Sequence, residues 1–141
     1  MLPLGVLLLY LVLAFIITTI ARTPGSVRRQ NFLLLHTLKE AVEGSGYAVK
    51  LIFFNGVLLA PLGFLVPLIL EYRCGAPDIL FLSFLVSASI ECTQYLFRLG
   101  LMEGDDLIFN CLGALAGYVL ALIMRRAAFL FRIRGKGQER P

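Results

Sequence analysis

Four long runs of apolar residues, separated by short polar segments, dominate the pattern of this chain. They cover residues 2–21, 51–70, 79–97 and 107–124. Each is close to the roughly 20 residues that an α-helix needs to cross the hydrocarbon core of a bilayer. The pattern therefore predicts an all-α, polytopic membrane protein: a four-helix transmembrane bundle that forms one domain over residues 1–141, with a basic tail over residues 125–141.

The first apolar run resembles a signal peptide at its end, where Thr19 and Ala21 are small residues of the kind that precede a cleavage site. It has no positively charged start, and it is longer than the about 7–15 apolar residues of a signal peptide. We therefore interpret residues 2–21 as a helix that is retained.

The longest polar segment, residues 22–50, contains a helical pattern of its own between Asn31 and Glu43. Its apolar and polar positions fall on opposite sides: Leu34, Leu38, Ala41 and Val42 against His36, Lys39, Glu40 and Glu43. This is typical of a short helix that lies in the membrane interface. A short soluble helix packed on the bundle fits the same pattern.

The second apolar run is interrupted by helix-breaking and polar residues: Asn55, Gly56, Pro61, Gly63 and Pro67. Proline removes a backbone donor and kinks a helix, which neighbouring groups compensate in a membrane. The run is therefore either a kinked packing helix or one wall of a binding cavity.

Polar residues recur along one face of the third run. These are Ser83, Ser87, Glu91, Gln94 and Arg98. Positions four, seven and eleven apart share a helix face, and the rest of the run is mostly apolar. The stripe should therefore face the bundle interior.

The fourth run repeats this arrangement with Asp106, Asn110, Gly113 and Gly117 on one face. The two glycines form a G-x-x-x-G motif, which allows close approach of another helix backbone. We expect the motif to let the third and fourth spans meet, so that their polar stripes lie together.

Two roles compete for these polar residues. As structural contacts, Arg98 would pair with Glu103, Asp105 or Asp106, and Glu91 with Gln94 or Asn110. Such interhelical bonds contribute roughly 0.6–2 kcal/mol, whereas a carboxylate inside a span costs about 2.5–3.5 kcal/mol. A Glu in mid-span is therefore an expensive structural contact, and we favour a site for a cationic group, a polar headgroup or a proton.

The net charge of +4 does not indicate nucleic-acid binding, because no recognised motif accompanies it. The basic residues flank the apolar runs, as in proteins that contact anionic lipids. They are Arg22, Arg28, Arg29, Lys39 and Lys50 before the second run, and Arg125, Arg126, Arg132, Arg134, Lys136 and Arg140 after the fourth.

Metal and cofactor binding are not predicted. Cys74, Cys92 and Cys111 share no metal-ligand spacing, and His36 is the only histidine. Four spans place both termini on one side of the membrane. The acidic start and basic end of the fourth span favour cytoplasmic termini, which puts the polar cluster near the outer face.

Three segments carry a resemblance to a known family. Residues 55–63 have the form N-x5-P-x-G, residues 91–94 the form E-x-x-Q, and Asp106, Asn110 and Gly113 the form D-x3-N-x2-G after an acidic turn. In this order they resemble the VanZ family of membrane proteins.

Three positions depart from that family's pattern. The segment from Asn31 lacks the Pro-Phe of an N-L-x-P-F motif at Leu34 and Leu35. Glu103 stands where an Asp is usual, and Leu101 where an Arg is common. These departures concern the shape of the loops.

The resemblance implies a multi-pass protein of a bacterial plasma membrane. The family's namesake is associated with low-level resistance to teicoplanin, a glycopeptide that binds cell-wall precursor termini. The polar residues themselves predict the functional cluster, which comprises Glu91, Gln94, Arg98, Glu103, Asp105, Asp106 and Asn110. Its expected centre is Glu91, Gln94, Asp106 and Asn110, with Pro61 and Gly63 on the opposing wall. Membrane lipids are the expected partners, with a cell-wall precursor or glycopeptide and self-association left open.

Two other functions fit the same residues. Paired carboxylates can do acid–base work, so an intramembrane enzyme acting on a lipid or lipid-linked cell-wall precursor is one alternative. A small proton-coupled transporter is the other. Neither a nucleophile–base pair nor an inverted repeat is visible in the sequence, and a non-enzymatic role is therefore preferred.

Overall fold

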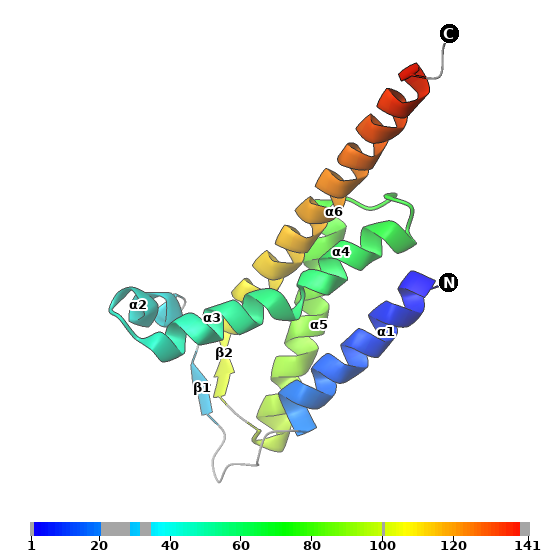
Figure 1. Ribbon diagram of the computed structural model, residues 1–141. Coiled ribbons are helices and arrows are strands. Elements are labelled where there is room, and N and C mark those ends of the chain that lie inside the picture. The colour runs from blue at the N-terminus through cyan, green and yellow to red at the C-terminus, as the bar shows by residue number, and fades with distance from the viewer. Residues whose placement is uncertain (1, 21–28, 32–34, 100, 139–141) are drawn as a thin grey trace.

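The computed structural model describes residues 2–20, 29–31, 35–99 and 101–138, with residues 2, 20, 29–31, 101–103 and 134–138 described by their backbone only. Helices make up almost all of these residues (Figure 1). In chain order the elements are α1 (Leu2–Phe15), the π-helical turn η1 (Ile16–Ile20), β1 (Arg29–Asn31), α2 (His36–Val42), α3 (Gly46–Leu58), α4 (Ala60–Ile69), α5 (Ala76–Phe97), β2 (Leu101–Glu103) and α6 (Gly104–Gln138).

Three helical segments among the described residues are long and apolar enough to cross a membrane. They are Gly46–Ile69, which combines α3 and α4, then Ala76–Phe97 and Gly104–Ile133. The N-terminal apolar helix, Pro3–Thr19, is shorter. The helical membrane-protein class is confirmed, while a crossing by the first span stays a prediction.

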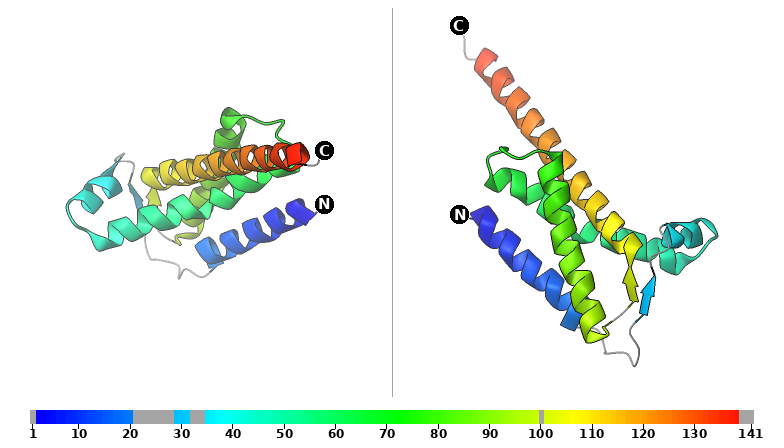
Figure 2. Two further views of the ribbon diagram at one scale, coloured as in Figure 1. Left: turned by 45° about the horizontal axis from the view of Figure 1, so that its top comes forward. Right: turned by 180° about the vertical axis from the view of Figure 1, so that it is seen from behind.

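Helix α6 is the centre of the bundle, because it packs against α3, α4 and α5, and α1 packs on α4. In both views of Figure 2, the start of α1 and the last turns of α6 lie toward the same end as the α4–α5 turn. The strands and the start of α6 lie toward the other end. The arginines in the C-terminal half of α6 therefore lie at one end of the molecule, and Asp105 and Asp106 in its first turn lie at the other. We call these the basic end and the acidic end.

The second predicted span is broken rather than continuous. Helix α3 ends at Leu58, Leu59 leaves helical geometry, and Pro61 stands in the first turn of α4. Proline has no N–H to donate and is accommodated at a helix start. The Tyr10 hydroxyl donates to the carbonyl of Leu58 at 2.6 Å, so α1 supplies a hydrogen bond at the break.

Helix α5 starts and stops on clear local signals. Asp78 accepts a hydrogen bond from the Gly75 N–H at 2.8 Å, and Pro77 occupies the first turn. A carboxylate at this place favours the helix N-terminus. At the other end Arg98 adopts a left-handed conformation, with φ 58°, which turns the chain out of the helix.

One local prediction is wrong, and the secondary structure of the basic tail is new. The helix expected over residues 31–43 begins only at His36, because Leu35 is left-handed and Arg29–Asn31 is extended and pairs in parallel with Leu101–Glu103. The basic tail continues α6 as helix to Gln138. Its residues after Met124 include no proline before Pro141, and Arg, Ala and Leu are good helix formers.

Candidate functional site

The polar stripe of α5 faces the bundle interior, as predicted. Ser83 and Ser87 have no exposed surface, and Glu91 and Gln94 are each 2% exposed. Apolar residues on the other side, such as Phe81, are largely exposed. The 3.6-residue period alone accounts for this division.

Arg98 does not share the stripe. It is exposed, because the left-handed backbone at the helix end turns it away from the buried face. It forms no ion pair with Asp105 or Asp106, and the side chain of Glu103 lies outside the described residues. The interior position predicted for Arg98 is therefore wrong.

Side-chain hydrogen bonds connect the polar face of α6 to its neighbours. The Asn55 amide on α3 donates to Asp106, which is 6% exposed. The Asn110 amide donates to the Ser87 hydroxyl on α5 at 2.8 Å. One face of α6 thus joins α3 on one side and α5 on the other through polar groups.

The glycines of α6 face α3 and α4, and the expected contact with α5 is wrong. A Cβ added at Gly113 would overlap the carbonyl of Gly56, and one at Gly117 would overlap that of Ala60. The contact is reciprocal, because a Cβ at Gly63 would overlap the carbonyl of Ala114. We call this line of small residues on α3, α4 and α6 the glycine seam; it brings Asn55 within reach of Asp106.

The end of the N-terminal helix contributes a backbone group to the cluster. The Gln94 amide donates to the carbonyl of Thr18 at 3.1 Å. Thr18 belongs to the π-helical turn η1, and the Thr18 hydroxyl donates to the carbonyl of Ala14 at 2.8 Å. The sequence interpretation missed Thr18, since a backbone acceptor carries no side-chain signal.

Asp105 lies beside the cluster but holds a different element. Its two carboxylate oxygens accept the N–H groups of Leu35 at 2.5 Å and Thr37 at 2.8 Å. Free N–H groups at a helix start favour a negative charge. Asp105 therefore anchors the first turn of α2. For Asn31, which was also singled out in the sequence, the structure describes the backbone only.

Comparison with known families decides the membership of the chain. A family model described as VanZ/LLP1 matches residues 3–125. The chain belongs to the VanZ/LLP1 family. No curated protein and no solved structure matches it significantly.

The three motifs that carried the VanZ/LLP1 resemblance are joined by contacts in the structure. The N-x5-P-x-G and D-x3-N-x2-G segments meet through Asn55 and Asp106 and, two turns farther along α6, through Gly56 and Gly113. The E-x-x-Q segment follows Ser87, the partner of Asn110, by one helical turn. The motifs therefore form one structural unit.

One acceptor in this VanZ/LLP1 cluster has no partner. Asn110 is 1% exposed, and its Oδ1 accepts no hydrogen bond from any described group. A buried polar atom left unsatisfied costs about 1–3 kcal/mol. Among the described residues, no three His, Cys, Asp or Glu side chains are close enough to hold a metal ion. The geometry suits a small hydrogen-bond donor at Asn110.

Proposed function

We propose that this VanZ/LLP1 protein lowers the sensitivity of a bacterium to teicoplanin, through a buried polar centre formed by Glu91, Gln94, Asp106 and Asn110. The family membership supports the link to the glycopeptide. The observation that carries the site is the buried Asn110 acceptor, which lies beside a carboxylate-bearing helix face and lacks a donor. A purely structural contact would satisfy both ends of the amide.

The proposed ligand group is a hydrogen-bond donor, such as an ammonium or hydroxyl group of a lipid headgroup or cell-wall precursor. Glu91 lies one turn beyond Ser87 on α5, and Asn110 bonds to Ser87. A carboxylate and an amide oxygen accept hydrogen bonds and attract positive charge. This composition favours a cationic or hydroxylated group over an anion.

We further propose that the acidic end of the bundle faces outward and that both termini are cytoplasmic. The basic residues after Met124 then lie inside, as the positive-inside rule expects. Helix α2 would lie in the outer interface, because Leu38 and Val42 on its apolar side are exposed while Thr37 is buried. An amphipathic helix at an interface presents its apolar side to lipid.

The orientation is testable with two exposed positions at opposite ends. Arg73 lies on the α4–α5 turn and Arg98 at the end of α5. In a variant without native cysteines, a membrane-impermeant maleimide should label Arg98→Cys in intact cells and Arg73→Cys only after permeabilisation. The reverse pattern would place the acidic end inside and contradict an outer-surface role.

The function is tested by expressing the chain in a teicoplanin-sensitive bacterium. The wild type should raise the minimal inhibitory concentration of teicoplanin relative to the empty vector. Asp106→Asn should lower that protection at equal membrane abundance, since it removes a charge while keeping the shape of the side chain. Absence of protection by the wild type would overturn the proposed function.

A further inference from the structure

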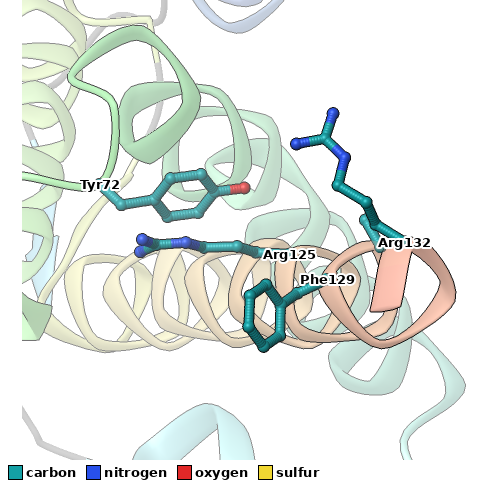
Figure 3. A pocket seen from close by; sticks show the side chains of 5 residues that line it. Tyr72, Arg125, Phe129 and Arg132 are labelled. Carbon is teal, nitrogen blue, oxygen red and sulfur yellow. The ribbon is translucent and has the colours of Figure 1, made fainter. Parts of the chain in front are cut away.

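A second polar site lies at the opposite, basic end of the molecule. Here a hollow of about 380 Å³ is lined by side chains of the α4–α5 turn and the C-terminal half of α6: Tyr72, Arg125, Ala128, Phe129 and Arg132 (Figure 3). Arg125, Phe129 and Arg132 recur at four- and seven-residue spacing, so one helix face presents them all.

Tyr72 is held over this helix face by an unusual turn. The Arg125 guanidinium stacks on its ring, with 4.4 Å between Cζ and the ring centroid. Both Glu71 and Tyr72 have positive φ, a conformation that L-residues rarely adopt. The Tyr72 N–H donates to the carbonyl of Pro67 at 2.6 Å. Figure 3 shows the Tyr72 hydroxyl pointing along α6 toward the side on which Arg132 lies.

The two arginines are not neutralised by the chain itself. Among the described side chains, neither Arg125 nor Arg132 lies within ion-pair distance of a carboxylate, while the nearby Arg73 pairs with Glu71. Guanidinium groups bind phosphate oxygens well. The hollow thus combines two uncompensated cations with an aromatic hydroxyl.

The position along the chain identifies where the ligand comes from. Arg125 directly follows the apolar run 107–124, so it is expected where that run meets the headgroups. Beyond it, Leu130 and Phe131 are exposed together with Phe129, which lines the hollow. Cationic and aromatic groups next to exposed apolar side chains match a headgroup and its acyl chains.

We propose that this hollow binds the phosphate group of an anionic glycerophospholipid. Arg132 contacts the phosphate oxygens, and Arg125, held under the Tyr72 ring, adds a second positive charge beside them. The Tyr72 hydroxyl, which donates to the Ala121 carbonyl at the long distance of 3.4 Å, turns its proton to a phosphate oxygen when the lipid binds. Phe129 lies against the glycerol and upper acyl chain. This site is separate from the buried polar centre and does not depend on the proposed function.

The chain has no tryptophan, so Tyr72→Trp places a single fluorescent reporter in the hollow and keeps an aromatic face for Arg125. The full chain is reconstituted in phosphatidylcholine bilayers that contain brominated phosphatidylglycerol, and quenching gives the relative binding constant of the anionic lipid. Brominated phosphatidylcholine measures the non-specific background. The anionic lipid should be preferred several-fold.

The matched control is Arg126, the next residue along, which has the same charge but does not line the hollow. In the Tyr72→Trp background, Arg132→Gln should lower the preference by about 5-fold, the share of one arginine at a membrane surface. Arg126→Gln should leave it nearly unchanged. Equal losses would indicate diffuse surface charge and overturn the site, as would no preference in the parent variant.

Two further arms complete the test. If inorganic phosphate at millimolar concentration displaces the brominated phosphatidylglycerol, the site takes free phosphate and the lipid assignment is wrong. With Tyr72 kept, native mass spectrometry should show co-purified phosphatidylglycerol on the wild type and on Arg126→Gln, and less on Arg132→Gln. Equal retention on all three chains would contradict the proposal without relying on the tryptophan variant.

Discussion

The glycine seam makes a sharp prediction about two glycines that touch each other. Gly113 on α6 faces the backbone of Gly56 on α3, so a Cβ at Gly113 would overlap the Gly56 carbonyl. A Cβ at Gly56, in contrast, would meet no atom within 4 Å. The same substitution to alanine should therefore have opposite effects on the two sides of one contact.

The magnitude follows from the atoms involved. Overpacking costs about 1–3 kcal/mol, and the upper end applies here because the overlapped atom belongs to the backbone and cannot rotate away. Alanine regains about 1 kcal/mol of helix propensity over glycine. Gly113→Ala should therefore lower the free energy of unfolding by about 2 kcal/mol, while Gly56→Ala should leave it unchanged or raise it by up to about 1 kcal/mol.

The assay is reversible unfolding in mixed micelles of dodecyl maltoside and increasing SDS, followed by far-UV circular dichroism. Gly113→Ala should unfold at a lower SDS fraction than the wild type, and Gly56→Ala at the same or a higher one. Equal stability of Gly113→Ala and the wild type, or an equal loss in both variants, would refute the close approach of α6 to α3.

Three more predictions concern single contacts. Asn55→Ala removes the amide that donates to Asp106 and should cost about 1–3 kcal/mol in the same unfolding assay; Asn55→Asp should cost more, because it faces a second carboxylate. Asp105→Ala removes the acceptor of two N–H groups at the start of α2 and should speed hydrogen exchange there about tenfold, as expected for a lost cap of about 1–2 kcal/mol, while Glu43→Gln, at an exposed position beyond the last turn, should not. Burial, and then the charge of Asp78, raise the pKa of the Cys74 thiol above its ordinary 9.0. Less thiolate is therefore present at a given pH, and maleimide alkylation of Cys74 should be slower than that of a peptide thiol. Asp78→Asn should shift the midpoint of the alkylation rate against pH downward.

Helix faces were predictable because they depend on local periodicity. The spacing of Ser83, Ser87, Glu91 and Gln94 defines one side of α5 whatever it packs against, and burial confirms that side. The same holds for Asp106, Asn110, Gly113 and Gly117 on α6. The helix that packs against each face was less predictable, because residue spacing shows which residues share a face and not which helix they contact. The glycines consequently face α3 and α4 instead of α5.

The remaining differences arise from backbone features that side-chain pattern does not encode. The pairing of Arg29–Asn31 with Leu101–Glu103 joins two three-residue segments far apart in the chain, too short for an alternation signal. Arg98 fits the helical period, but its left-handed backbone ends α5 and leaves it exposed. The hollow beside Tyr72 depends on positive φ values at Glu71 and Tyr72 in the α4–α5 turn. Neither residue is a glycine, so the sequence does not predict this conformation.

The central claim is that the buried polar centre acts in glycopeptide sensitivity and does not only hold the helices together. The most direct measurement is the minimal inhibitory concentration of teicoplanin for cells expressing Glu91→Gln or Ser83→Ala, two buried positions of one helix face. Both variants are compared at the same membrane abundance as the wild type, and their SDS unfolding midpoints are checked to equal that of the wild type. We predict that Glu91→Gln loses protection and that Ser83→Ala keeps it. Full protection by a stably folded Glu91→Gln chain would contradict the claim.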